Sequence, residues 1–159
     1  MKRIKITIIF LIFLICAPSF AQEKVIANKI VVELGVISWK DIKKEFSESP
    51  RTPDEENYLK MIKAMAHTHG ENIEDSYHIF VVLKDRASGR QINDAKVEVT
   101  AKKGWEKVKH KLQFMNLKNS AGYGQFFRLS SKSFYIFEVK ISLDGTKRIY
   151  KVKFKKSLE

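Results

Sequence analysis

Residues 134–154, FYIFEVKISLDGTKRIYKVKF, decide the fold of this chain. Apolar and polar side chains alternate through residues 134–143 and again through residues 147–154, which is the period of a strand with one buried face. Asp144-Gly145 separates the two runs, and such a pair is the strongest short hairpin signal that a sequence offers. We therefore predict two antiparallel strands joined by a tight turn.

The same period of two continues upstream in further runs. These are residues 77–84 (YHIFVVLK), 95–101 (AKVEVTA), 108–115 and 124–129 (GQFFRL). Turn signals separate them at residues 85–89 (DRASG), 103–104 and 119–122 (NSAG). Six or seven short strands at this spacing predict a mainly β chain, with an antiparallel immunoglobulin-like β-sandwich over residues 75–159.

Residues 22–74 have a different pattern and form a predicted region of one strand and one helix. Residues 27–38 are apolar enough for a strand that adds to the sandwich. A short amphipathic helix is predicted over residues 53–66, with Thr52 as the cap and Pro53 in the first turn. Its apolar stripe allows two roles: a lid packed on the sandwich, or a free arm that binds a membrane or a partner.

The first 21 residues have the pattern of a secretory signal peptide. Three basic residues precede an apolar run over residues 6–17, and Ser19-Phe20-Ala21 resembles a signal-peptidase site. We expect cleavage near Ala21 and a periplasmic or secreted protein. The only cysteine, Cys16, lies in this segment, and Ile15 before it argues against lipid attachment. Metal ligands after cleavage would therefore have to be histidine, methionine, carboxylate or backbone groups.

The chain is basic, with a formal net charge of +12 that becomes +9 without the three basic residues of the signal. Outside the cytoplasm this charge points away from nucleic acid and toward an acidic periplasmic or membrane protein, or toward peripheral contact with anionic lipid. Lysines also alternate with apolar residues in the run KVKFK, residues 151–155, which is typical of a solvated strand face. Both interpretations stay open.

Motifs of catalysis do not stand out in the sequence. A cysteine nucleophile, a G-x-S-x-G elbow, a phosphate-binding glycine loop and an H-E-x-x-H pair are all missing from residues 22–159. We therefore predict a protein that is not an enzyme.

Soft and borderline metal ligands gather in one part of the chain. Within 18 residues fall Met61, Met65, His67, His69 and His78. Thioether sulfur favours Cu(I), whereas imidazole also suits Cu(II) or zinc, so the combination points to copper. The competing interpretation is that the histidines are solvated in a polar loop and that the methionines fill the core.

The expected geometry of this site depends on a few positions. His67 and His69 would point to opposite sides of an extended segment unless the chain bends, which Gly70 allows. His78 opens the strand over residues 77–84, and we expect it at a sheet edge, where Met115 from another strand could face it. The predicted site is partly open, lies at one end of the sandwich, and takes His67 or His69 as a further ligand and Met65 as an optional one.

Four segments resemble a known family. They are SYHIFVVLKDRASGRQINDAKVEV, KLQFMNL, AGYGQFFRL and FYIFEVKISLDG. Together they resemble the YtkA-like or FixH-like periplasmic immunoglobulin-like domains over residues 75–155. The resemblance implies a sandwich outside the cytoplasm, near copper handling and respiratory oxidase maturation. It carries over His78 and Met115 as ligands and treats Tyr123-Gly124 as a turn.

The sequence thus predicts an exported, non-enzymatic, metal-binding β-sandwich that carries or buffers an ion, most simply copper. The alternative is a metal-free interaction module whose basic face docks on an acidic protein or a membrane surface.

Overall fold

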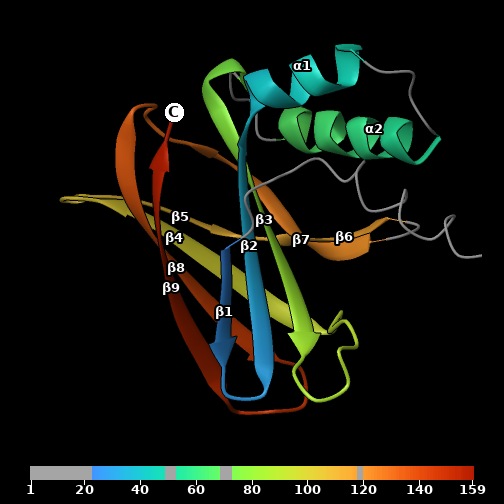
Figure 1. Cartoon of the computed structure of the whole chain (residues 1–159), viewed down its shortest axis with the longest axis vertical. Helices are drawn as coiled ribbons and strands as arrows, with labels where there is room; N and C mark the ends of the chain where they lie inside the picture. Colours follow the sequence, from blue (N-terminus) through green and yellow to red (C-terminus); the bar gives the residue numbers. More distant parts are fainter. Residues whose placement is uncertain (1–22, 49–52, 69–72, 118–119) are drawn as a thin grey trace, which may run out of the picture.

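The computed structural model describes residues 23–48, 53–68, 73–117 and 120–159, and these form an antiparallel immunoglobulin-like β-sandwich (Figure 1). One sheet has five strands in the order β1-β2-β3-β7-β6, and the other has four in the order β5-β4-β8-β9. The strands of the first sheet are β1 (Glu23–Ala27), β2 (Ile30–Ser38), β3 (Ser76–Asp85), β7 (Ser120–Arg128) and β6 (Gln113–Leu117). Those of the second are β5 (Glu106–Lys111), β4 (Ala95–Lys103), β8 (Ser133–Leu143) and β9 (Ile149–Leu158). The predicted fold class is confirmed.

The hairpin that residues 134–154 predict is formed by β8 and β9. Phe137 pairs with Phe154 and Ile141 with Tyr150, in antiparallel register. Gly145 has a φ of 77° in the connecting loop, a conformation that glycine adopts without steric cost.

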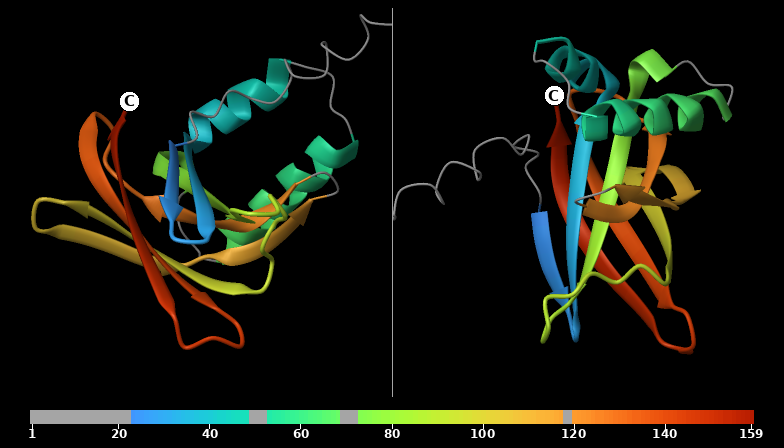
Figure 2. Two further views of the ribbon diagram at one scale, coloured as in Figure 1. Left: turned by 60° about the horizontal axis from the view of Figure 1, so that its bottom comes forward. Right: turned by 90° about the vertical axis from the view of Figure 1, so that its right-hand side faces the viewer.

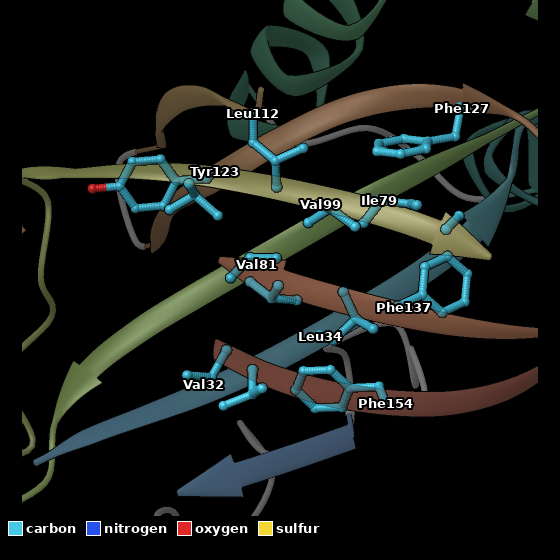
Figure 3. Packing of buried hydrophobic residues seen from close by; sticks show 14 of the residues in the cluster. Val32, Leu34, Ile79, Val81, Val99, Leu112, Tyr123, Phe127, Phe137 and Phe154 are labelled. Atoms are coloured by element: carbon cyan, nitrogen blue, oxygen red, sulfur yellow. The ribbon is translucent and has the colours of Figure 1, made fainter. Parts of the chain in front are cut away.

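The core lies between the two sheets and is built from the alternate residues that face inward (Figure 3). Burial of one such side chain contributes about 1.5–3 kcal/mol, so this layer is the main source of stability. The five-stranded sheet contributes Val32, Leu34, Ile79, Val81 and Phe127, and the four-stranded sheet contributes Val99, Phe137, Val139 and Phe154.

Near the amino terminus the structure has more elements than the sequence patterns predicted. The single strand predicted over residues 27–38 is β2 alone, and a turn at Asn28, with a φ of 58°, connects it to the additional strand β1. A helix that was not predicted, α1 (Trp39–Glu48), follows β2 directly. Ser38 caps it, because its hydroxyl oxygen accepts a hydrogen bond from the backbone N–H of Asp41 at 3.0 Å.

One strand prediction and one turn prediction in the second half are wrong. The run over residues 108–115 is divided at Leu112, where the chain leaves β5 in one sheet and enters β6 in the other. The turn predicted over residues 119–122 is also misplaced, because Ser120 already belongs to β7. Gly122 serves packing there: a Cβ on it would lie 2.6 Å from Cζ of Phe80.

The helix predicted over residues 53–66 is present as α2 (Pro53–Thr68), while its predicted cap, Thr52, lies outside the described residues. Both α1 and α2 pack on strands of the five-stranded sheet, so α2 is a lid and not a free arm (Figure 2). A second apolar cluster fills this layer: Trp39, Ile42, Leu59, Ile62, Met65, Met115 and Phe126.

Among the described residues, helices of the length and apolarity needed to span a bilayer do not occur. The predicted signal peptide, residues 1–21, lies outside the described residues.

Candidate metal centre

His78 lies on β3, on the face of the five-stranded sheet that the helices cover. Its neighbours Tyr77 and Ile79 point into the sandwich core, so the imidazole points outward toward the helical layer. The side chain is fully buried, with its ring 5.0 Å from that of Phe126 and 6.2 Å from that of Phe80, between centroids. The predicted edge position is wrong, because β3 lies between β2 and β7.

Burial lowers the pKa of His78 from 6.5 to about 4. The cause is desolvation, which disfavours the charged imidazolium among aromatic neighbours. The ring is therefore neutral at physiological pH. A neutral imidazole is the form that binds a metal ion, and here an ion would not have to displace a proton.

Met115 lies on β6 and is 1% exposed. The register pairs it with Gly122 on β7, while His78 pairs with Phe126 on the other side of the same strand. Gly124 sits between these two positions, so both side chains can lean across β7 toward it. The sequence prediction that Met115 could face His78 agrees with this arrangement, although both residues lie on the outer face of a sheet and not at the end of the sandwich.

Gly124 brings the two donor atoms to one place. A Cβ built on it would lie 2.4 Å from Sδ of Met115 and 2.7 Å from Nε2 of His78. The sum of these distances, 5.1 Å, is the largest separation that the sulfur and the nitrogen can have. An ion with bonds of about 2.0 Å to nitrogen and about 2.3 Å to sulfur can join donors at most about 4.3 Å apart, so even at the largest separation the donors would have to approach by less than about 1 Å.

The sequence patterns did not identify Gly124 as part of the site. The family resemblance predicts a turn at Tyr123-Gly124, but both residues lie inside β7, where Gly124 pairs with Phe80 and Gln113. A glycine inside a strand marks close approach of other groups, which is the signal that could have found it. Here the close groups are an imidazole and a thioether.

Of the other predicted ligands, the structure brings Met65 to this layer. Met65 lies on α2, is 6% exposed, and belongs to the buried cluster that contains Met115. Met61 packs against the same cluster and is partly buried. His67 lies on the last turn of α2, but its side chain is not described, and His69 lies outside the described residues. Their role as ligands stays a prediction.

Two further observations, on groups of metal ligands and on a surface cleft, restrict where a metal ion could bind. Within the described ranges, histidine, cysteine and carboxylate side chains form no group of three that could hold an ion. A surface cleft of about 280 Å³ lies between the sheets, lined by residues such as Val108, Arg128 and Tyr135, and contains none of the predicted ligands. Among the described residues, the buried imidazole–thioether pair is therefore the candidate donor set, with one borderline and one soft ligand.

Comparison with solved structures identifies the fold. A DUF4426 family protein from Pseudomonas aeruginosa matches with a TM-score of 0.57 at 13% identity, covering 87% of this chain and 96% of that chain. The chain has the same fold. A copper-bound variant of FetP from uropathogenic Escherichia coli strain F11 gives 0.59 at 12% identity, covering 87% and 95%. Copper-reconstituted P19 from Campylobacter jejuni gives 0.54 at 10% identity, covering 86% and 92%.

Sequence comparisons add nothing to this result. No family model matches the chain. No curated protein matches it either. The resemblance to YtkA-like or FixH-like domains therefore stays a prediction, whereas the sandwich that it implied is present.

Proposed function

We propose that this protein is an exported, non-enzymatic copper-binding sandwich that carries or buffers Cu(I). The observation that carries the proposal is the meeting of Nε2 of His78 and Sδ of Met115 over Gly124. Both side chains are buried, so neither presents its donor atom to bulk water. One imidazole and one thioether directed at the same place are a copper-type donor set.

The surroundings favour Cu(I) over Cu(II). Thioether sulfur is a soft ligand that selects Cu(I). Transferring an ion into a low-dielectric layer costs more for a double charge than for a single one, and Phe80 and Phe126 supply no compensating charge here. Zinc prefers a larger set of histidine, cysteine or carboxylate ligands, which this layer does not bring together among its described residues.

Helix α2 gives the site a cover that can supply a further ligand. Met65 belongs to the same buried cluster as Met115, and we propose its thioether as the second soft donor. His67 follows one half-turn later on α2, and we propose it or His69 as an imidazole ligand at the end of the helix. Movement of this single helix would open the site, so the ion could be handed on without unfolding the sandwich.

Two other findings support the proposal. The amino-terminal sequence has the pattern of an export signal, which would place the protein in a periplasm or outside the cell. In addition, solved proteins with the same fold were obtained with copper bound. We propose the role of carrier or buffer because the site offers metal donors and the sequence of residues 22–159 has no motif of catalysis.

The test is a competition titration of the purified protein with Cu(I) and a colorimetric chelator of known affinity. The double variant His78→Ala/Met115→Ala should bind Cu(I) at least about 100-fold more weakly than the wild type, because both donors are removed. His110→Ala is the matched control, since His110 packs against Phe127 and not at this site. Equal affinity of the double variant and the wild type would refute the proposal.

A further inference from the structure

The outer face of the four-stranded sheet is a concentrated lysine surface. Alternate residues of its strands face outward, and the register places them side by side. The charged members of this face, named here the lysine face, are nine lysines and two glutamates, a formal charge of +7. They are Lys96, Lys102, Lys107, Lys109, Lys111, Lys140, Lys151, Lys153, Lys155, Glu98 and Glu138.

Ion pairs neutralise only part of the lysine face. Nζ of Lys102 lies 2.6 Å from Glu138, and Nζ of Lys109 lies 3.0 Å from Glu98. The register also places like charges directly opposite each other, as with Lys140 and Lys151. Such pairs destabilise a sheet unless an anionic partner screens them.

The charges of these lysines act on one carboxylate of the face, Glu138. A hydrogen bond from Lys102 lowers the pKa of Glu138, and the charges of Lys153 and Lys151 lower it further. Three lysines from β4 and β9 therefore act on this one carboxylate.

Exposed aromatic side chains adjoin the lysine face at one end. Trp105 forms the tip of the β4–β5 hairpin and is 100% exposed, and Phe134 at the start of β8 is 54% exposed. The pairing of Lys102 with Ile136 places both aromatics at the same end of the sheet. Helices α1 and α2 pack on the other sheet, so in the described part of the chain they leave this surface open (Figure 2).

We propose that the lysine face binds the surface of an anionic lipid bilayer, with Trp105 entering the headgroup region. An extended array of lysines matches a diffuse negative surface, whereas protein interfaces are enriched in arginine and depleted in lysine. All nine basic residues of this face are lysines. Tryptophan is the side chain that membrane interfaces favour most, because its ring is apolar and its N–H is polar.

This orientation turns the candidate metal centre away from the bilayer. His78 and Met115 lie on the outer face of the five-stranded sheet, so the sandwich separates them from the lysine face. The inference does not depend on copper binding, and the metal-free protein should bind lipid equally well.

The experiment is co-sedimentation of the purified protein with vesicles. Vesicles of equal parts phosphatidylglycerol and phosphatidylcholine should bind the protein, whereas vesicles of phosphatidylcholine alone should not. Binding should weaken at least about tenfold between about 0.05 M and 0.5 M salt, because the screening length falls over this range.

Matched charge reversals locate the surface. The triple variant Lys140→Glu/Lys151→Glu/Lys153→Glu should lose at least about tenfold in vesicle affinity, because three facing charges are inverted. Lys40→Glu/Lys60→Glu/Lys63→Glu has the same net charge but changes exposed positions on α1 and α2. This control should bind within about threefold of the wild type.

Fluorescence tests the role of Trp105, since the only other tryptophan, Trp39, is buried. Emission should shift to the blue when anionic vesicles are added, and the shift should be lost in Trp105→Ser. The proposal is overturned if anionic vesicles do not bind the protein, as for a surface that binds only acidic proteins. It is also overturned if both triple variants lose equal affinity, or if emission does not change.

Discussion

His78 and Met115 belong to strands β3 and β6, which do not pair with each other, and their side chains meet over the strand between them, at Gly124. A side chain at Gly124 would occupy the position that the nitrogen and the sulfur share. The glycine therefore determines whether the two donors can approach. The absence of a side chain at Gly124 on β7 is therefore a condition for metal binding by His78 and Met115 together.

The first prediction concerns that glycine. Gly124→Ala should destabilise the fold by about 1–3 kcal/mol, because the new methyl group overpacks a filled layer. It should also weaken Cu(I) binding at least about tenfold by separating the donors. Urea unfolding and chelator competition measure the two effects.

A core variant provides the control for Gly124→Ala. Ile141→Val lies in the sandwich core and should cost about 0.5–1.5 kcal/mol without changing the Cu(I) affinity. Wild-type affinity in Gly124→Ala would show that the two donors do not meet at this position.

The second prediction is a pH dependence that arises from His78. Its pKa is 6.5 in the unfolded chain and about 4 in the folded protein, so between these values the unfolded state binds more protons. Stability is therefore complete above about pH 6.5 and falls as the pH decreases toward 4, by about 3 kcal/mol from this group. Urea unfolding of the metal-free protein at several pH values measures the effect.

Other carboxylates titrate in the same range, so the comparison with His78→Gln isolates the histidine. This variant should show a smaller loss of stability between pH 6.5 and 4 than the wild type. Parallel stability curves for the two proteins would contradict the assigned burial of His78.

Strands β4, β8 and β9 could be predicted from alternation because each has one buried face. In residues 134–154 the alternation and the Asp-Gly pair agree, and β8 and β9 follow them closely. Alternation does not identify the neighbouring strand, however. It continues from β5 through Leu112, although the chain there moves to the other sheet. The division between β5 and β6 is therefore a tertiary feature without a local signal.

The missed helix had a local signal that the strand patterns obscured. Ser38 and Asp41 have the spacing of a capping pair, and Trp39 and Ile42 are three residues apart and buried. For the site, the resemblance carried over His78 and Met115, but the partner of both, Gly124, was assigned to a turn. Only the register of three strands shows what this glycine does.

The third prediction concerns the cover of the site. Met65→Leu should change stability by less than about 1.5 kcal/mol, because leucine has a similar volume and shape. It should weaken Cu(I) binding less than Met115→Leu does, because Met65 is the optional ligand, on the covering helix, and Met115 is one of the two donors beside Gly124. Chelator competition with both variants measures the order, and a larger loss in Met65→Leu would reverse the assigned roles.

The fourth prediction tests how β7 is held in the sandwich. The hydroxyl oxygen of Tyr123 accepts a hydrogen bond from the backbone N–H of Ala95 at 3.0 Å, and this joins β7 to β4 of the opposite sheet. Tyr123→Phe should lower the free energy of unfolding by about 1 kcal/mol. The Cu(I) affinity should stay unchanged, because Tyr123 faces the core and not the helical layer. A large loss of affinity would mean that the site depends on this anchor.

The most direct test of the metal centre is the X-ray absorption spectrum of the Cu(I)-loaded protein at the copper edge. The proposed site predicts both a sulfur shell and an imidazole nitrogen shell around copper, with the sulfur contribution reduced in Met115→Leu and the imidazole contribution reduced in His78→Gln. A spectrum with only oxygen and nitrogen neighbours, unchanged in Met115→Leu, would contradict binding between His78 and Met115.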